Sequence, residues 1–412
     1  MMAWINKIFK KENKANINIY NIEKELQNIK KLVNCSRSPG LFSCEEDFLT
    51  ERLLAHPVKK VLPDVKLSSH KVIKRANRWK VSERLLTAYN KAIGDGKHFT
   101  LERESDDLWS DLISRELVEL VDILQAQDVD KLADFITEFG STYTWFGGVS
   151  TSIDGFNKNL NPQHVAITYL DKLICLGEYL GVLNVENPEF GAWGNSLHEN
   201  IDALINEIEA IIGIDITPPM GIIHTDGIAT SKGVFHYRHI NSLYIACRIS
   251  CLNESKGAVY EFGGGLGIAA MYAHRLGFHD YTILDLPITC LLSGHYLINA
   301  LGEECVSLYG EKNTKKTIKI LPYWECLNTN NKAVEVTINQ DGFPEMSENL
   351  IFEYIKQISR FTRGYFLSMN HEYSFPKTVN NIIKNNKNFN KLYRFKSWCR
   401  EGYVEEAYRI LK

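Results

Sequence analysis

The stretch that decides the fold is Val259-Tyr260-Glu261-Phe262-Gly263-Gly264-Gly265-Leu266-Gly267. Its first four residues form a short apolar strand pattern, and Ile268 to Leu276 follows with helical spacing and stops at Gly277. Glycines between a strand and a helix let the backbone turn tightly and approach a ligand, because they carry no Cβ atom. The stretch therefore predicts the first unit of a parallel sheet, with a binding site at its turn.

The residues after this turn continue the alternation of strands and helices. This pattern is typical of a doubly wound α/β sheet with helices on its faces. The last two strands are expected to close the sheet as an antiparallel pair. The expected strands are Tyr281–Leu284, Val334–Ile338, Tyr365–Ser368, Leu392–Trp398 and Val404–Leu411, and the expected helices are Pro287–Leu301 and Asn349–Phe361.

The residues before the turn are expected to be mostly helical. Apolar residues recur at helical spacing from Ser82 to Ile93 and from Ser105 to Phe139, Pro162 begins another helix, and Asn195 begins one that runs to Ile212. No stretch before residue 214 is expected to form a strand. We therefore predict three parts: a helical N-terminal region (1–140), a helical and extended connecting region that forms a substrate wall (141–250), and the α/β domain (251–412).

Composition and charge exclude several classes of protein. The 412 residues contain 47 Lys plus Arg against 50 Asp plus Glu, so a net charge of -3 predicts no general attraction to nucleic acid. A basic segment, Lys59–Lys80, is the best candidate for a local nucleic-acid surface, but a solvated helical face or a basic linker explains it equally well, and no nucleic-acid partner is expected. Nine cysteines without a CxxC pair predict no zinc site, and no apolar run is long enough to insert into a membrane. Cytoplasmic localisation is expected.

The spacing of the glycines distinguishes between two nucleotide cofactors. A dinucleotide fingerprint requires G-x-G-x-x-G/A, but Ile268 stands at the third position and is too large for that role. The spacing here is G-x-G-x-G. Glu261 lies two positions before Gly263, where a carboxylate can bind the ammonium of a methionine-like ligand directly or through water. The pattern therefore favours S-adenosylmethionine (SAM) over NAD.

A second carboxylate supports a nucleoside site. Asp285 follows Gly263 by 22 positions and ends the next expected strand, where it can accept both hydroxyls of a ribose. A tight turn that only packs a helix on a sheet would explain the glycines alone. It would not explain both acidic residues at neighbouring strand ends.

In these residues and in the motifs around them, the chain resembles a family of bacterial SAM-dependent sugar O-methyltransferases. The resemblance covers about the last 160 residues. It rests on VYEFGGGLG, on YTILDLP from Tyr281, on VSLYGE from Val306, on ILPYW from Ile320 and on INQDGFPEM from Ile338. It implies a seven-stranded methyltransferase sheet and transfer of a methyl group to a sugar hydroxyl, with a sugar or glycan as acceptor.

The resemblance and the pattern together assign a cofactor-binding set. Thr337 departs from the apolar residue expected in the fourth strand, and His371-Glu372 departs from the basic residue associated with the end of the fifth. Arg238, upstream of the sheet, is predicted to receive the methionine carboxylate. The full set is Glu261, Gly263, Gly264, Gly265, Gly267, Asp285, Leu286, Asn339, Gln340 and Arg238.

Methyl transfer to a hydroxyl is expected to need a general base, because a protonated hydroxyl is a poor nucleophile. Ligands bind beyond the carboxyl ends of strands in such sheets, which nominates Asp341 and Glu345 after the fourth strand and His371 and Glu372 after the fifth. We rank His371 first and Asp341 second, and keep Glu372 as a third catalytic candidate. Aromatic side chains that could stack on a sugar are Tyr143, Trp145, Phe146 and Trp193.

Two functions from other classes compete with this hypothesis. One is a scaffold protein that keeps a methyltransferase-like fold for partner contacts, and the other is an NAD-dependent oxidoreductase, which Ile268 disfavours. No metal ligand is assigned, because the histidines near Arg238 lack a recognisable ligand spacing, although a divalent ion is compatible with the chemistry. A homo-oligomer is compatible with the sequence as well.

Overall fold

The computed structural model describes residues 63–96, 108–141, 161–187, 194–312, 317–373 and 378–411. The chain divides into two compact units, Met1–Ser43 and Cys44–Lys412, and all described residues belong to the second. The predicted division at residues 140 and 250 stays a prediction. The predicted helical start of the chain, the aromatics Tyr143, Trp145, Phe146 and Trp193, and the basic residues Lys59 and Lys60 lie outside the described residues.

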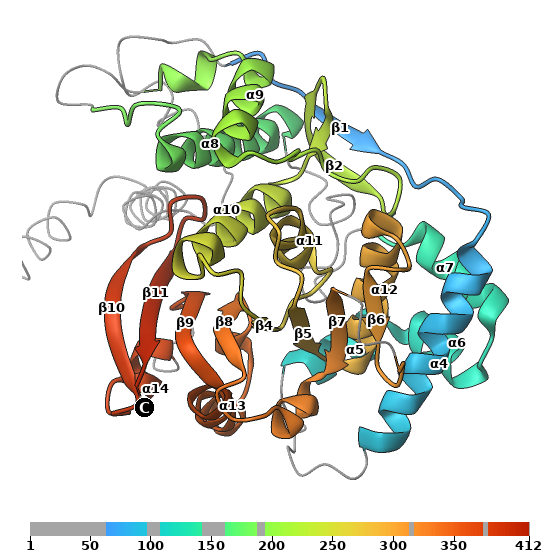
Figure 1. Cartoon of the computed structure of the whole chain (residues 1–412). Coiled ribbons are helices and arrows are strands. Elements are labelled where there is room, and N and C mark those ends of the chain that lie inside the picture. The colour runs from blue at the N-terminus through green and yellow to red at the C-terminus, as the bar shows by residue number, and fades with distance from the viewer. Residues whose placement is uncertain are drawn as a thin grey trace, which may run out of the picture. The chain divides into compact units, whose positions relative to one another are not determined.

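An eight-stranded sheet organises the C-terminal part of the chain, in the order β10-β11-β9-β8-β4-β5-β7-β6 (Figure 1). The six strands from β9 to β6 are parallel, whereas β11 pairs with both β9 and β10 in antiparallel fashion. The predicted α/β class and the doubly wound sheet with a closing antiparallel pair are confirmed. The strands are β4 (Val259–Phe262), β5 (Tyr281–Asp285), β6 (Val306–Leu308), β7 (Ile318–Pro322), β8 (Val334–Gln340), β9 (Thr362–His371), β10 (Phe389–Lys396) and β11 (Tyr403–Ile410).

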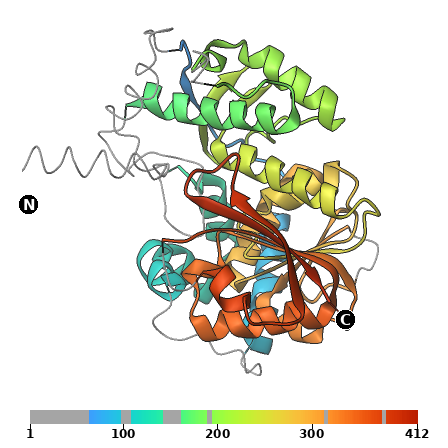
Figure 2. The same ribbon diagram turned by 90° about the vertical axis from the view of Figure 1, so that its left-hand side faces the viewer.

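Helices cover both faces of this sheet, because its parallel strands are apolar on both sides (Figure 2). On one face lie α10 (Tyr237–Leu252), α11 (Ile268–Arg275) and α12 (Pro287–Leu301), and on the other lie α13 (Glu348–Phe361) and α14 (Val379–Ile383). The side chains of neighbouring residues in a strand therefore point to opposite faces of the sheet. Phe262 and Leu284 enter the core beneath α13, whereas Ile283 faces the glycine turn and α12.

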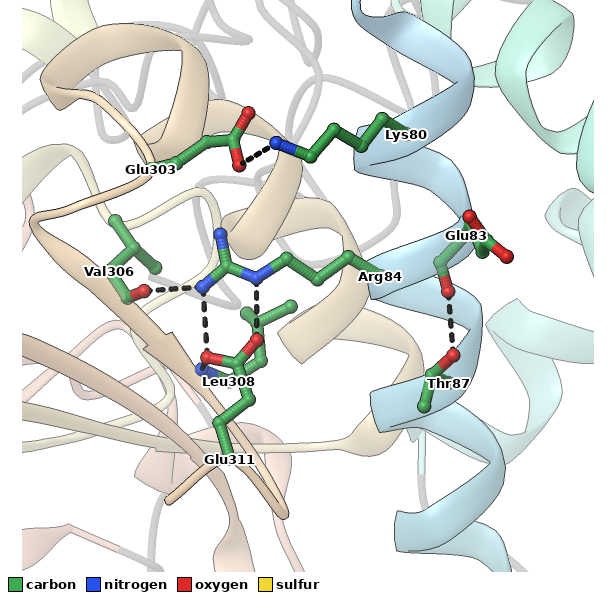
Figure 3. A network of polar contacts seen from close by, with 8 residues as sticks. All are labelled: Lys80, Glu83, Arg84, Thr87, Glu303, Val306, Leu308 and Glu311. Atoms are coloured by element: carbon green, nitrogen blue, oxygen red, sulfur yellow. Dashed lines mark hydrogen bonds and ion pairs between the residues drawn. The ribbon is translucent and has the colours of Figure 1, made fainter. Parts of the chain in front are cut away.

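The sheet has one strand more than the seven expected. The segments VSLYGE and ILPYW contain the parallel strands β6 and β7, and β6 is the short strand at the sheet edge. Helix α4 (Arg78–Gly96) anchors this edge, as Figure 3 shows. The Arg84 guanidinium donates to both carboxylate oxygens of Glu311, at 2.5 and 2.9 Å, and to the carbonyl oxygen of Val306. Glu311 in turn accepts the Leu308 amide, so the end of β6 is bonded to α4.

The expectation that no strand occurs before residue 214 is wrong. Leu67–His70 forms β1, which pairs antiparallel with β2 (Thr225–Thr230), and β2 pairs with β3 (Gly233–Phe235). The four residues of β1 have no clear alternation of apolar and polar side chains, and their partner lies more than 150 residues away. Pairing across the fold, rather than local pattern, makes this segment a strand.

The upstream helices are more numerous and shorter than expected. The segment predicted from Ser105 to Phe139 contains three helices, and the helix predicted from Asn195 begins only at Ile201, capped by Asn200, after a turn of 3-10 helix at Ser196–His198. No helix among the described residues is long and apolar enough to span a membrane. The helices are α5 (Leu108–Glu116), α6 (Val118–Ala126), α7 (Val129–Glu138), α8 (Pro162–Leu180) and α9 (Ile201–Ile212).

Candidate functional site

The strand order reverses direction between β4 and β8. From β4 the chain proceeds to β5 on one side, whereas β8 and β9 lie on the other. In open α/β sheets, ligands bind outside the carboxyl ends of the strands at such a reversal. The glycine turn follows β4, and the residues from Asn339 onward end β8, so the two predicted ligand-binding segments meet at this point. Their neighbouring ends are paired in register, with Phe262 opposite Asn339.

The glycines of the turn have different structural roles. Gly263, Gly265 and Gly267 all have a positive φ, at 74°, 57° and 80°, which most other residues adopt only with strain. A Cβ atom on Gly267 would lie 2.6 Å from the Leu297 side chain, so this glycine allows α11 to pack closely. A Cβ atom on Gly263 would meet only the Asn339 amide, at 3.9 Å. The backbone at Gly263 therefore borders the space that a ligand would use.

Asp285 closes the turn from the neighbouring strand. Its carboxylate accepts the Gly265 amide at 3.0 Å and the Leu286 amide at 2.7 Å. These bonds fix the carboxylate beside the turn at the carboxyl end of β5, and each oxygen keeps the capacity to accept a further hydrogen bond. The predicted ribose-binding residue and the predicted glycine turn are thus brought together.

Glu261 lies beneath the turn, where it is only 2% exposed. The Tyr281 hydroxyl donates to it at 2.8 Å, and a Cβ atom on Gly264 would lie 3.1 Å from its carboxylate. Burial raises the pKa of Glu261 to about 7, against the effect of the Tyr281 hydrogen bond. A cationic ligand group that approached through the turn would favour the ionised form of this carboxyl.

Asn339 joins the ends of three strands. Its amide nitrogen donates to the Phe262 carbonyl at 2.9 Å, and its amide oxygen accepts from the Asn370 side chain and from the Phe343 amide. The side chain is buried and makes these bonds within the protein, so it fixes the relative positions of the three strand ends. Gln340, the next residue of β8, is partly buried.

A cluster of polar side chains continues the site beyond β8 and β9. Asp341 has a left-handed backbone, with φ of 59°, and its amide donates to the Met369 carbonyl. Its carboxylate accepts from the Arg400 guanidinium at 2.6 Å and from the Tyr403 hydroxyl at 2.5 Å. Burial alone would raise the pKa of Asp341, but the charge of Arg400 and the hydrogen bond from Tyr403 hold it below its ordinary value.

His371 and Glu345 lie beside Asp341. Side-chain nitrogen and oxygen atoms of the three residues lie within 4.8 Å of one another. Burial lowers the pKa of His371, so its imidazole is neutral near pH 7, and its Nδ1 atom is buried without a hydrogen-bond partner among the described residues. Burial and the charge of Asp341 raise the pKa of Glu345 well above its ordinary value.

Arg238 approaches the same cluster from the N-terminal turn of α10. Its charge lowers the pKa of both Asp341 and Glu345, behind larger causes, and its Nε atom is buried without a hydrogen-bond partner among the described residues. A buried guanidinium nitrogen without an acceptor is costly. Among the described residues this donor of Arg238 is unused, and its assignment to the ligand carboxylate stays a prediction.

Glu372 and the basic segment, which the sequence also singled out, are held by ion pairs. Glu372 pairs with Arg394 of β10 at 2.7 Å, and this third catalytic candidate remains a prediction. In the described part of the basic segment, Lys74, Arg78 and Lys80 each form an ion pair with an acidic residue, and its interpretation stays a prediction.

The trio of Asp341, Glu345 and His371 is not assigned as a metal site. Both oxygens of Asp341 already accept hydrogen bonds from Arg400 and Tyr403. Two guanidinium groups also oppose a further cation, because like charges repel in a partly buried site. The donor set therefore fits a proton-exchanging site better than a divalent ion.

Arg400 and Tyr403 were missed by the sequence analysis. They lie in and after the turn between β10 and β11, and Tyr403 is paired in register with His371. A strand antiparallel to β9 must begin where β9 ends, so the turn between the two closing strands reaches the carboxyl edge. The antiparallel direction of the closing strand could therefore have placed both residues near the site. Their separation of about 60 residues from Asp341 along the chain gave no local indication of the contact.

Comparisons with known proteins concern the fold alone. No protein-family model matches the chain, and no curated protein sequence matches it. A SAM-dependent methyltransferase from Aquifex aeolicus is 14% identical, with a TM-score of 0.28 over 43% of this chain and 100% of its own. Geranyl diphosphate C-methyltransferase from Streptomyces coelicolor A3(2) is 10% identical, with a TM-score of 0.30 over 40% and 77%. The PH0226 protein from Pyrococcus horikoshii OT3 is 13% identical, with a TM-score of 0.33 over 42% and 90%.

Proposed function

We propose that this protein is a SAM-dependent O-methyltransferase that transfers a methyl group to a hydroxyl of a sugar or glycan. One observation carries the proposal: a glycine turn is hydrogen-bonded to an acidic strand end, at the point where the strand order reverses. The Gly265 amide donates to Asp285, and the space beside Gly263 is free of side-chain atoms closer than 3.9 Å to an added Cβ. These features fit a nucleoside held by its ribose hydroxyls.

The residues present fit the amino-acid part of SAM as well. Glu261 supplies a carboxyl beneath the turn, and Arg238 supplies a buried guanidinium nitrogen without a partner among the described residues. A ligand with both an ammonium and a carboxylate would satisfy these two groups. NAD has no such pair, and Ile268 opposes its fingerprint, so the dinucleotide alternative is disfavoured.

Bound SAM would supply a methyl group on a positively charged sulfur. The chain must then hold an acceptor oxygen in line with that methyl carbon, exclude water and remove the hydroxyl proton. His371 is the proposed first base, because its neutral imidazole lies at the end of β9 beside the polar cluster. Asp341 is held by Arg400 and Tyr403, which suits a positioning group more than a base.

A polyhydroxylated acceptor matches the chemistry of this cluster. Carboxylates, an imidazole, a phenol and guanidinium groups together offer both acceptors and donors to several hydroxyls. The scaffold alternative is less favoured, because it gives no reason for polar atoms of Arg238 and His371 to lack partners among the described residues.

Calorimetric titration of the purified protein with SAM and with NAD tests the cofactor. We expect SAM to bind with a micromolar dissociation constant, about -8 kcal/mol, and NAD to give no heat of binding. Transfer of a labelled methyl group from SAM to a panel of hexoses, sugar nucleotides and glycan fractions then tests the acceptor class. Binding of NAD in place of SAM, or transfer to no hydroxyl compound, would contradict the proposal.

A further inference from the structure

Glu345 differs from Asp341, the other carboxyl of the polar cluster, because no described residue forms a hydrogen bond or ion pair with its carboxyl. Glu345 lies on the 3-10 helix η6 (Phe343–Glu345), four residues after Asp341. A partly buried carboxyl without such a partner is available for exchange of a proton or for a ligand.

The surroundings of Glu345 determine which form it takes. Asp341 lies within 4.8 Å and is ionised, and it therefore opposes a second negative charge. Arg238 and Arg400 favour the ionised form but do not bond to it, and Arg400 is already committed to Asp341. Two further neighbours among the described residues are the neutral His371 and the hydroxyl of Tyr403, which is also bonded to Asp341.

The loop that bears Glu345 is connected to the glycine turn. A Cβ atom on Gly342 would lie 2.9 Å from the Asn339 amide nitrogen, and the same nitrogen is the nearest atom to a Cβ on Gly263. That amide also bonds to the end of β4. The cofactor edge and the η6 loop therefore share one side chain, and a charge bound beside the turn acts within the same partly buried region as Glu345.

We propose that Glu345 releases its proton when the cationic cofactor binds, and that it takes up the acceptor's proton, delivered by His371, when methyl transfer removes the positive charge. This inference rests on the proposed function. It assigns to Glu345 a role in matching the charge of the site to the charge of the cofactor, whose sulfur is positive in SAM and neutral in the product S-adenosylhomocysteine.

The proposed step balances in atoms and charge. The acceptor oxygen forms a bond to the methyl carbon, and the carbon–sulfur bond breaks with its electron pair on sulfur. The hydroxyl proton moves to the imidazole of His371 and from there to the Glu345 carboxylate. One positive charge disappears from sulfur and one negative charge disappears from Glu345, so the net charge of the site is unchanged. Burial and Asp341, which both raise the pKa of Glu345, favour this final state.

Calorimetry with two ligands and two buffers tests the inference without any acceptor. SAM and S-adenosylhomocysteine are each titrated at the same near-neutral pH in phosphate and in imidazole, whose heats of ionisation differ. We expect the heat of SAM binding to depend on the buffer, because protons are released when SAM binds. The proton release on S-adenosylhomocysteine binding should be smaller, because its sulfur is neutral, although Glu261 meets the same ammonium in both ligands.

Matched variants identify the group that titrates. Glu345→Gln should abolish the difference in proton release between SAM and S-adenosylhomocysteine while SAM still binds. Glu348→Gln, which alters an exposed carboxyl three residues away, should leave the proton release unchanged. A circular dichroism spectrum like that of the parent shows that each variant is folded.

The alternative outcomes are distinct. Equal proton release by SAM and S-adenosylhomocysteine in the parent protein, or a difference that persists in Glu345→Gln, would overturn this inference and leave the proposed function standing. Failure of SAM to bind the parent protein would instead contradict the proposed function. If Mn²⁺ alone binds the parent protein but not Glu345→Gln, the carboxyl is a metal ligand and the inference is wrong.

Discussion

The Gly265 amide donates a hydrogen bond to the Asp285 carboxylate across 3.0 Å, and this bond joins the glycine turn after β4 to the end of β5. The Leu286 amide donates to the same carboxylate at 2.7 Å. Asp285 thus has two roles in the proposed site. It shapes the turn in the free protein, and it would accept the ribose hydroxyls of a bound nucleoside.

Replacement of Asp285 should therefore affect both ligand binding and stability. We expect Asp285→Ala to weaken SAM binding roughly tenfold to a hundredfold, and to lower the free energy of unfolding by about 1 to 3 kcal/mol because two backbone amides lose their acceptor. Calorimetry and urea unfolding measure the two effects. Asp280→Ala is the matched control, because Asp280 is exposed at the opposite end of β5 and pairs only with Lys319 among the described residues. Unchanged SAM affinity in Asp285→Ala would show that the nucleoside does not bind at this strand end.

Two glycine variants distinguish an effect on ligand binding from an effect on helix packing. Gly263→Ala should cost about 1 to 2 kcal/mol in stability, because of its positive φ, and should weaken SAM binding at least roughly tenfold, because the new methyl group enters the ligand space. Gly267→Ala should cost about 3 kcal/mol, because the methyl group would also collide with Leu297. Thermal unfolding and calorimetry compare the two proteins. Equal loss of stability in both would show that the space beside Gly263 is not open.

The carboxylate of Asp341 should make stability depend on acid pH. Its pKa in the folded protein is lowered by Arg400 and Tyr403 despite burial, so its contribution is present above the unfolded pKa of about 3.9 and is lost as pH falls toward the folded value. Asp341→Asn should lower the free energy of unfolding by about 1 to 3 kcal/mol at neutral pH, with a smaller difference below about pH 4. Urea unfolding across this range measures it, with the exposed Asp111→Asn as control. A difference that grows in acid would contradict the assigned shift.

His371→Ala should lower turnover roughly tenfold to a thousandfold and leave SAM affinity nearly unchanged. Burial lowers the pKa of His371, so activity of the parent should persist to below about pH 6.5 and then fall as the imidazole becomes charged. Initial rates of methyl transfer across pH test both statements. His279→Ala, at an exposed histidine just before β5, should retain activity and serves as the control. Full turnover in His371→Ala would exclude the imidazole from proton transfer.

The contact between Arg84 and Glu311 should be worth more than an ordinary surface ion pair. Both side chains are largely buried, and the guanidinium bonds to both carboxylate oxygens and to β6. A double-mutant cycle with Arg84→Met and Glu311→Gln should give a coupling of about 1 to 3 kcal/mol in urea unfolding. The neighbouring exposed pair, Lys80 and Glu303, should give about 0 to 1 kcal/mol. Equal couplings would mean that α4 is held to the sheet edge by apolar packing alone.

The glycine turn and its acidic partner could be predicted because their signals are local. Strand, turn and helix follow one another from Val259 to Arg275, and the next strand ends at Asp285, so short periodic patterns were sufficient. Thr337 shows where local reasoning fell short. It departs from the expected apolar residue, yet its hydroxyl lies 2.6 Å from the Thr362 hydroxyl inside the sheet, where the two satisfy each other. That pairing depends on the neighbouring strand.

By itself, the sequence determined the doubly wound sheet, the closing antiparallel strands and the position of the candidate cofactor turn, because apolar periodicity and glycine torsion preferences act over a few residues. Only the tertiary structure decided that Leu67–His70 is a strand, that β6 and β7 extend the sheet, and that Arg400 and Tyr403 hold Asp341. Each of these contacts joins segments far apart in the chain. Their free energy comes from pairing and burial between distant groups, which no local pattern records.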